Sequence, residues 1–545
     1  MLRRALVVTG LVIACSATPA AVAAGPPEPG TGASGRTFSG TAKDGSVLGF
    51  ADDHVHITAS LRAGGRVIHG EPFDRHGVAA ALGHDARDHG ADGSGDVVGN
   101  LLRGESPTAT HDTGGWPTFA GWPEHDTLTH QQVYWVWLKR AWQAGLRLVV
   151  AQTVEDDELC RVQKRRSHSC SEPVAIARQV NVLRGLQRYV DRRSGGRGPG
   201  FFRLVYTPRR ARRIIERGKL AVLIGVESSN PFGCRLEDGR SACTAKDVDR
   251  GLAAYHRLGI RSLFVAHWFD NAFAGAALEG GLRGVFINAL NRLETGHYLR
   301  VSHCPHRGQG EQAAAAPKAV IDLIAPFFRG VSALAGLPVP SYPQGPRCNA
   351  RGLTTLGVHL VRRMMKLHMI IEAEHMSERA RDRLLRIAGA RRYPVVSGHN
   401  GTGGVWTNGE LRRLYATGGL AATTLGTAPE LIRGIDRFAR FGHGRRDFGV
   451  PLGSDVGGFA SLPGPSGSAQ PLRYPFKAFR GDVTFHRQRT GRRVFDLDTD
   501  GVAHYGLVAD LIADVERRPG GRRALRTLFH SAEAYLDMWQ RTGAR

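Results

Sequence analysis

The apolar residues of the chain gather in eight short runs, each of which ends in a polar or glycine-rich turn. Within a run the apolar positions are continuous and do not alternate with polar ones, which is typical of strands buried on both faces of a parallel sheet. We therefore expect eight buried strands. The runs cover residues 47–58, 146–154, 220–228, 261–268, 369–376, 393–400, 420–426 and 449–455.

Helical patterns lie between many of these runs. One apolar face repeats every 3.6 residues and leads into the fifth run; it consists of Leu353, Leu356, Leu360, Met364 and Leu367. A similar face precedes the second run and ends before Gly145; it consists of Val133, Trp137, Ala141 and Ala144. A strand followed by a helix, eight times over, predicts an α/β protein with a (β/α)8 TIM barrel over residues 40–545.

Two gaps between successive runs are much longer than the others. Allowing for the preceding strand and the following helix, they correspond to insertions at about residues 59–126 and 272–349. Both insertions follow the C-terminal end of a strand. In barrels of this kind the loops at that end form the active site, so we expect both insertions to lie on the catalytic face.

Composition and charge narrow the class of protein. The chain has 545 residues, of which 42% are hydrophobic, so it can bury a large core and is neither disordered nor a disulfide miniprotein. No run of eighteen apolar residues occurs, which excludes a polytopic membrane protein. The formal net charge is +24, but arginines are spread along the whole chain without a basic tail or stripe. We therefore expect no nucleic-acid partner.

The first residues predict export. Residues 1–4 carry two arginines and residues 5–14 are apolar, which together resemble a signal peptide over residues 1–24. Two cleavage sites compete. Residues 12–15 resemble a lipobox that would leave a lipidated Cys15, whereas Ala21-Val22-Ala23 would suit ordinary signal peptidase. The expected product is a secreted protein or a cell-surface lipoprotein, with contact to a membrane only through a lipid anchor at Cys15.

The remaining cysteines are even in number, which supports an exported chain with disulfides. Six cysteines allow fifteen pairings, and neighbours along the sequence suggest three of them. A zinc site of cysteines is disfavoured because no C-x₂₋₄-C spacing occurs. The suggested pairs are Cys160–Cys170, Cys234–Cys243 and Cys304–Cys348.

Histidines and carboxylates stand at the ends of five predicted strands. Taken singly, each has an ordinary explanation, such as a salt bridge between Glu227 and one of the many arginines. Together they suit two divalent metal ions, most simply Zn²⁺, because imidazole and carboxylate are ligands that zinc prefers. No lysine stands at a strand end where it could bridge two ions, so Glu227 is the candidate bridge. The residues are His54, His56, Glu227, His375, His399 and Asp455.

Five segments resemble the membrane (renal) dipeptidase family of the amidohydrolase superfamily, of which the chain would be a divergent bacterial exported member. The clearest are GLTTLG at 352–357 and MIIEAEHMS at 369–377. YPVVSGH at 393–399, GSDVGG at 453–458 and LGIRSL at 258–263, which continues to His267 and Asn271, are also similar.

The resemblance implies a two-zinc hydrolase that cleaves a small peptide or amide bond with a metal-bridging hydroxide. His54, His56, His375 and His399 would bind the metals, with Glu227 between them. His267 would contact the substrate and stabilise the oxyanion, and Asn271 would help to bind the substrate. Asp455 would take a proton from the attacking water and pass it to the leaving amine.

Two positions differ from the family pattern. The first strand has H-x-H where the family usually has H-x-D, and the loop after His399 lacks the arginine that grips the substrate's carboxylate. Three alternatives therefore stay beside the dipeptidase-like hydrolase. They are an amidohydrolase acting on a cyclic amide, lactone or other ester, a non-catalytic cell-surface binding protein, and a glycosidase that uses Glu227 and Asp455. The last leaves the histidines unexplained. The expected partner is a small-molecule or peptide substrate, and the sequence leaves the oligomeric state open.

Overall fold

The computed structural model describes residues 27–308, 310–311, 314, 318–399, 406–442, 448–467 and 470–545. The expected signal peptide and Cys15 lie outside the described residues.

Eight parallel strands follow one another around a barrel. Each strand pairs with the next one along the chain, and the last pairs with the first at Leu452 and Asp52. All eight predicted strands are confirmed. They are β2 (Phe50–Val55), β3 (Leu146–Glu155), β5 (Leu220–Ser228), β8 (Ile260–Phe264), β11 (Ile370–Glu372), β12 (Val395–Ser397), the seventh strand formed by β13 (Leu420–Ala421) and β14 (Thr423–Thr424), and β15 (Leu452–Gly453).

The seventh strand closes the barrel because its two halves pair with different neighbours. β13 is paired with β12, and β14 is paired with β15. A short additional strand, β4 (Phe202–Leu204), is paired with the beginning of β5 outside this order. Every residue of β3 and β5 is buried, as expected for strands covered on both faces.

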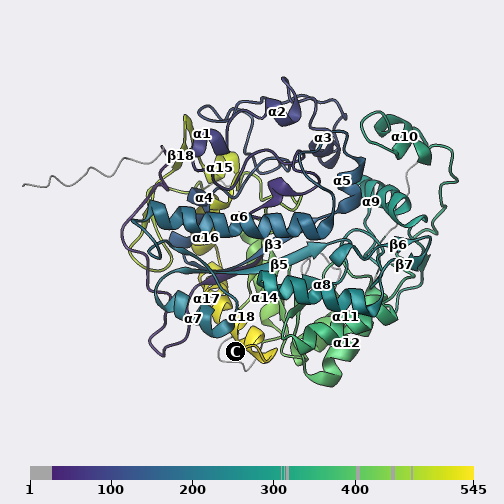
Figure 1. Ribbon diagram of the computed structural model, residues 1–545. Coiled ribbons are helices and arrows are strands. Elements are labelled where there is room, and N and C mark those ends of the chain that lie inside the picture. The colour runs from purple at the N-terminus through teal and green to yellow at the C-terminus, as the bar shows by residue number, and fades with distance from the viewer. Residues whose placement is uncertain are drawn as a thin grey trace, which may run out of the picture.

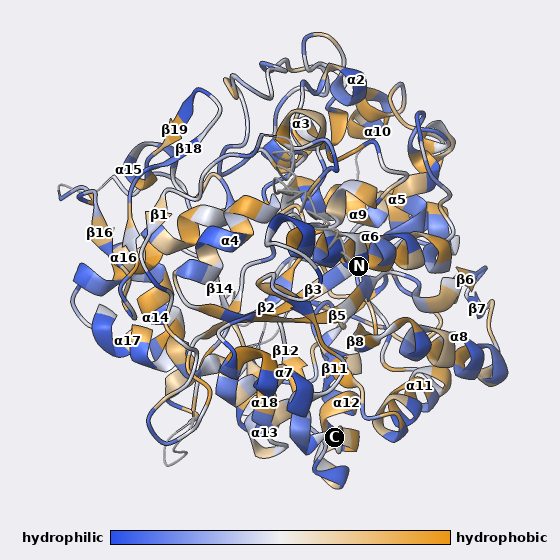
Figure 2. Cartoon of the chain, turned by 60° about the vertical axis from the view of Figure 1, so that its left-hand side comes forward, coloured by the Kyte–Doolittle hydropathy of each residue, from blue (hydrophilic) through white to orange (hydrophobic). Residues whose placement is uncertain are grey.

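Amphipathic helices surround the strands. Figure 2 shows orange barrel strands, with helices such as α8 and α11 divided into orange and blue faces. The two predicted helices are confirmed as α4 (Trp135–Gln143) and α11 (Thr355–Lys366). The others around the barrel are α6 (Glu172–Arg193), α7 (Pro208–Glu216), α8 (Ala245–Leu258), α12 (Glu378–Arg391), α13 (Asn408–Ala416), α14 (Ala428–Ala439), α16 (Val508–Arg517), α17 (Gly521–Phe529) and α18 (Ser531–Arg541).

Long segments follow β2 and β8, where the two insertions were expected, and their helices lie along the top and right of the molecule in Figure 1. The first insertion contains η1 (Ala59–Leu61), α1 (Val78–Ala81), α2 (Ala86–His89) and α3 (Val97–Arg103). The second contains α9 (Gly281–Thr295), β9 (Val301–Ser302), α10 (Lys318–Ile324), η3 (Val331–Leu334) and β10 (Cys348–Asn349). The two insertions share one hydrophobic cluster, in which Val98 and Leu128 of the first join Ile287 and Leu290 of the second.

A third long segment follows the last strand, and the sequence pattern did not predict it. It contains β16 (Phe476–Lys477), β17 (Thr484–Phe485), β18 (Gln488–Thr490), β19 (Arg493–Phe495), α15 (Leu497–Asp500) and η4 (Tyr505–Leu507). β17 is paired with β1 (Ala33–Ser34), so this segment also holds the N-terminal part of the described chain. Shorter elements follow β3 and β5: α5 (Asp157–Val162), η2 (Pro231–Gly233), β6 (Leu236–Glu237) and β7 (Arg240–Ser241).

The three suggested disulfides are confirmed. Cys160–Cys170 lies after β3, Cys234–Cys243 after β5, and Cys304–Cys348 within the second insertion. Disulfides persist in oxidising compartments, so these bonds indicate an extracytoplasmic location. Among the helices of the described residues, none is both long and apolar enough to cross a membrane.

Glu172, at the start of α6, gives the fold a pH dependence that can be measured. Its buried carboxyl accepts hydrogen bonds from the backbone N–H of Phe232 and the hydroxyl of Tyr255, yet burial raises the pKa of Glu172 to about 8. The folded state thus holds this proton more tightly than the unfolded chain, whose glutamate has a pKa near 4.5. The stability contributed by the proton is present below pH 4.5 and is lost as the pH rises through 8.

We therefore expect Glu172→Gln, which imitates the protonated acid, to raise the melting temperature above that of the wild type at pH 8.5 and to lose this advantage at pH 5. Thermal unfolding at the two pH values measures the difference. Glu216→Gln, at an exposed position at the end of α7, is the control. An equal response of both variants to pH would contradict the assignment.

Candidate metal centre

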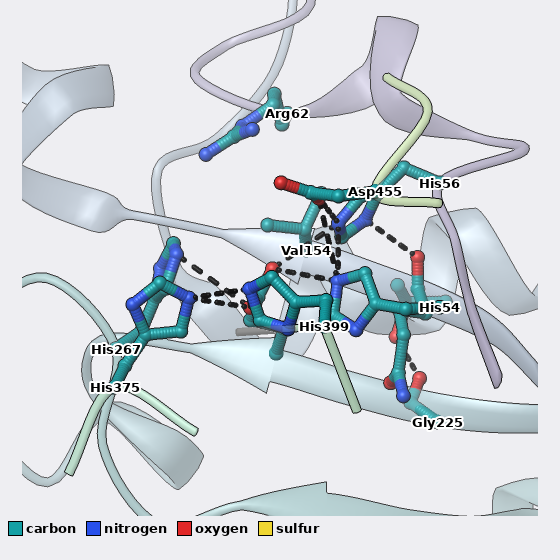
Figure 3. A network of polar contacts seen from close by, with 12 residues as sticks. His54, His56, Arg62, Val154, Gly225, His267, His375, His399 and Asp455 are labelled. Atoms are coloured by element: carbon teal, nitrogen blue, oxygen red, sulfur yellow. Dashed lines mark hydrogen bonds and ion pairs between the residues drawn. The ribbon is translucent and has the colours of Figure 1, made fainter. Parts of the chain in front are cut away.

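Seven of the predicted site residues meet at the C-terminal ends of the barrel strands. Figure 3 shows the imidazoles side by side, with Asp455 next to His54 and His56 and with His375 and His267 at the opposite end of the row. The residues come from six strand ends and are His54, His56, Glu227, His267, His375, His399 and Asp455.

Glu227 lies between two groups of histidines. Its Oε2 atom is 3.1 Å from Nε2 of His56 and 3.5 Å from Nε2 of His54. Its Oε1 atom is 3.3 Å from Nε2 of His375 and 3.9 Å from Nε2 of His399. One buried carboxylate therefore presents a different oxygen to each group.

Asp455 and His267 complete the two groups. Oδ1 of Asp455 is 3.2 Å from Nε2 of His56 and 3.5 Å from Nε2 of His54. On the other side, Nε2 of His267 is 3.7 Å from Oε1 of Glu227. The side chain of Asp455 is 17% exposed, so this carboxylate, unlike Glu227, is open to solvent.

Local backbone geometry explains how these side chains converge. His54 and His56 are two residues apart at the end of one strand, so their rings point to the same side, with Nε2 atoms 2.9 Å apart. His375 and Asp455 have positive φ values of 58° and 52°, which residues other than glycine rarely adopt. Such strained backbone is typical of functional sites. At Gly453 a Cβ atom would collide with the carbonyl oxygen of Gly398, so the close approach of these two strand ends requires glycine.

The electrostatic setting keeps the carboxylates ionised. Burial alone would raise the pKa of Glu227, but His267 and His54 beside it hold that pKa well below its usual range. Burial lowers the pKa of His56, but hydrogen bonds to Asp455 and Glu227 raise it to about 9. His399 behaves differently, because burial holds its pKa well below the usual value. Negative oxygens thus face a crowded set of ring nitrogens.

The hydrogen bonds of His56 test whether a cation suits this set. Nδ1 of His56 is 3.0 Å from the backbone oxygen of Gln152, which can only accept, so Nδ1 carries the proton of the neutral ring. Its Nε2 lone pair then faces the oxygens of Glu227 and Asp455 and the second nitrogen of His54. In the neutral ring these electron pairs repel one another, so a positive charge belongs between them. It is either a second proton on the ring, which the raised pKa of His56 favours, or a metal ion that replaces this proton. Metal-binding histidines usually donate a hydrogen bond from their other ring nitrogen to a backbone carbonyl or a carboxylate, as His56 does.

Two sets of possible ligand atoms result. In each set the atoms lie within 4.8 Å of one another. One set is His54, His56, Glu227 and Asp455; the other is Glu227, His267 and His375, with Nε2 of His399 2.9 Å from Nε2 of His375. Buried imidazoles and carboxylates of this kind suit zinc and its first-row neighbours. The clusters therefore form a candidate metal site.

Sequence reasoning missed two residues that hold His267 in place. Asp156 follows β3 directly, and its Oδ1 atom accepts a hydrogen bond of 2.8 Å from Nδ1 of His267. Its Oδ2 atom accepts one of 2.6 Å from Arg62 of the first insertion, which Figure 3 shows beside the centre. Although burial raises it, the pKa of Asp156 is lowered to about 2 by His267 and Arg62. The signal available in the sequence was a carboxylate one residue beyond a strand end.

Asn271 is occupied by the backbone. Its amide group donates to the oxygens of Ser229 and Val265, and its oxygen accepts from the N–H groups of Phe273 and Ala274. These four bonds fix the loop that follows β8, and the structure places Asn271 outside both sets of ligand atoms. Its contact with substrate stays a prediction.

Comparisons with known proteins give similarity in fold at low identity. The sequence matches no protein-family model and no curated protein sequence. Among solved structures, the metallopeptidase dipeptidase AC shares 14% identity and a TM-score of 0.41, over 74% of this chain and 88% of that chain. A metallopeptidase from Rhodobacter sphaeroides, liganded with a phosphinate mimic of the dipeptide L-Ala-D-Ala, shares 15% identity and a TM-score of 0.37, over 72% and 78%. The probable dipeptidase PvdM from Pseudomonas aeruginosa shares 13% identity and a TM-score of 0.34, over 75% of this chain and 89% of that chain. We therefore derive the function from the residues of the site.

A cavity of about 370 Å³ opens onto the centre. Glu227, His267, His375, His399 and Asp455 line its floor. Its wall carries charged side chains that sequence reasoning did not single out, because they lie in the second insertion and not at strand ends. They are Glu279, Arg283 and Glu311.

Proposed function

We propose that the protein is an exported hydrolase with two metal ions that cleaves the amide bond of a small peptide or a similar small amide. The observation that carries the proposal is the position of Glu227, whose two oxygens face two separate groups of histidines. After export the protein would be secreted or held at the cell surface by a lipid on Cys15. The partner would be the substrate itself, with no nucleic acid involved.

His54 and His56 would hold one Zn²⁺ and His375 and His399 the other, with Glu227 shared between them. Two such ions, when bound, lower the pKa of a water molecule and polarise the carbonyl of the bond to be cleaved. Asp455 is the group that can move a proton, because its ionised and partly exposed carboxylate lies on the floor of the cavity. It would accept a proton from water and deliver it to the leaving amine.

His267 would stabilise the negative oxygen of the transition state. Nδ1 of this ring donates a hydrogen bond to Asp156, so Nε2 is the nitrogen that faces the centre. A ring that carries a proton on each nitrogen can donate from Nε2 to the oxyanion while Nδ1 donates to Asp156. A donor of this kind contributes ~3–4 kcal/mol to catalysis.

The cavity wall favours a substrate with charges of both signs. Arg283 can attract a carboxylate, while Glu279 and Glu311 can attract an ammonium group. A short peptide with two free ends carries both groups. Arg283 would thereby take the part of the arginine that the loop after His399 lacks.

We expect Arg283→Gln to raise KM for a dipeptide about tenfold to a hundredfold with little change in kcat, because a hydrogen bond between charged groups contributes ~1.5–3 kcal/mol. Steady-state kinetics with a dipeptide and with its C-terminal amide measure the effect. The wild type should prefer the free carboxylate and the variant should not. Arg300→Gln, an exposed position in the same insertion, is the control. An unchanged preference in the Arg283 variant would remove this residue from substrate recognition.

Metal analysis of the purified protein together with a panel of dipeptides, lactones and cyclic amides tests the proposal as a whole. Two bound ions at the centre and hydrolysis of dipeptides are expected. Cleavage of lactones or cyclic amides without cleavage of dipeptides would show that the protein acts on cyclic amides or esters instead. Absence of all hydrolysis, with salt-sensitive binding of anionic polymers, would make the protein a surface binder.

A further inference from the structure

A second group of histidines lies in the first insertion, which in the structure extends from the end of β2 to the start of α4. Asp85, immediately before α2, is surrounded by His89, His111 and His130. Its Oδ2 atom is 2.7 Å from Nε2 of His111, 2.7 Å from Nε2 of His130 and 3.1 Å from Nδ1 of His89. This group shares no residue with the candidate metal centre.

The group is buried, and its hydrogen bonds reach only one of the two carboxylate oxygens of Asp85. Asp85 is fully buried, His89 and His130 are each 1% exposed, and the side chain of His111 is 15% exposed. Three ring nitrogens crowd one oxygen of Asp85, whereas the other oxygen has no hydrogen-bond partner in the described part of the chain. Buried polar atoms are normally satisfied, so this imbalance requires an explanation.

The tautomer of His89 supplies one. Its Nε2 atom is 3.1 Å from the backbone oxygen of Val67, which can only accept, so Nε2 carries the proton of the neutral ring. In the neutral ring the lone pair on Nδ1 points at the negative Oδ2 atom of Asp85, so either a second ring proton or a metal ion belongs between these two atoms. A cation between these two atoms would turn a repulsion into two attractive bonds. The carbonyl of Val67 would then be the support that a metal-binding histidine usually has on its far nitrogen.

We infer that Asp85, His89, His111 and His130 bind one Zn²⁺ ion in a closed structural site. The four ligand atoms lie within 4.8 Å of one another, and three nitrogens with one carboxylate oxygen suit zinc. Four protein ligands fill a tetrahedral shell, which leaves no position for substrate. The ion would hold the insertion together and take no part in the reaction.

The first insertion contains little regular structure that could stabilise it without a bound ion. Its helices α1, α2 and α3 have only four, four and seven residues. It contains no cysteine, whereas the loops after β3, β5 and β8 each contain a disulfide. Segments with little regular structure commonly depend on a disulfide or a metal. The four ligands come from three separate stretches of the insertion, and the insertion carries Arg62, which holds Asp156 at the centre.

Zinc content of the full chain tests the inference, and the Glu227→Ala background separates the two sites. After removal of loosely bound metal, the wild type should retain about three zinc ions per chain and Glu227→Ala about one. Adding His111→Gln to Glu227→Ala should remove that last ion. His111 is chosen because it is the most exposed of the four ligands, so its replacement disturbs packing least. Asp85→Asn, which keeps the shape of the side chain, is the second variant if His111→Gln fails to fold.

His84→Gln is the matched control, because His84 precedes Asp85 and is exposed. It should retain the zinc content of its parent. The single variant His111→Gln should melt at a lower temperature than the wild type. A strong zinc chelator should lower the melting temperature of the wild type more than that of His111→Gln.

The outcomes are distinct from those for the candidate metal centre. One zinc ion in the wild type that is lost with His111→Gln but kept in Glu227→Ala would support the structural site even if the centre bound no metal. Zinc content unaffected by His111→Gln and by Asp85→Asn would overturn the inference and leave a buried hydrogen-bonded cluster around Asp85.

Discussion

Replacing Glu227 by alanine is expected to abolish hydrolysis and to release both ions from the centre. Each of its oxygens faces a different group of histidines, so its removal takes a ligand from both groups at once. Loss of a single oxyanion donor costs about 10²–10³-fold in rate, and loss of a shared carboxylate should exceed this range. Product formation and metal content of the same preparation measure the effect together.

Glu372→Gln is the matched control for this change. Glu372 is also a buried glutamate at the end of a strand, but burial raises its pKa to about 8, so glutamine imitates the protonated form it adopts at neutral pH. This variant should keep both ions and most of the activity. If Glu227→Ala kept both ions, Glu227 would have no role in binding them, and the proposal of a shared metal centre would be wrong.

The change Asp156→Asn should lower kcat by about 10²–10⁴-fold while both ions stay bound. Asp156 fixes the ring of His267 by accepting a hydrogen bond from Nδ1, and an asparagine that turns its NH₂ group towards Nδ1 cannot accept this bond. It also removes the buried negative charge beside His267. The measurements are kcat and the metal content of the same preparation.

Asp157→Asn tests whether the effect is specific. Asp157 is the next residue and is buried as well, but it pairs with Arg161 and Asn230 and not with His267. Its replacement should lower stability without a comparable loss of kcat. Equal losses from both variants would mean that Asp156 acts by holding the fold and not by positioning His267.

The barrel could be predicted because its physical cause is visible along the sequence. Strands buried on both faces must be apolar throughout, so runs such as 220–228 stand out. The C-terminal ends of parallel strands meet at one mouth, so Glu227 and His399 could be placed together although 172 positions separate them. Six of the eight observed strands are shorter than the runs, because several strand ends turn into the loops that carry the ligands; β3 and β5 are not shorter.

The other parts of the site depend on contacts between distant segments, which leave no pattern in the sequence near each residue. Asp156 and His267 belong to different loops, and Arg62 reaches Asp156 from the first insertion. Of the four proposed ligands in that insertion, Asp85 and His89 are one helical turn apart, but positions 111 and 130 follow no strand or helix period that would bring them to this pair. The segment after β15 was missed because no later strand exists against which its length could be compared.

The disulfides divide the molecule into two parts with different chemistry. All three close loops that follow barrel strands, and none of the three connects one barrel strand to another. Thiol reductants should thus loosen these loops, including the one between Cys304 and Cys348 that carries Glu311 of the cavity wall, while the strands beneath keep their pairing. A chain kept in a reducing compartment would form the barrel but leave these loops without their covalent closures, so the structure would be completed only after the chain reaches an oxidising compartment.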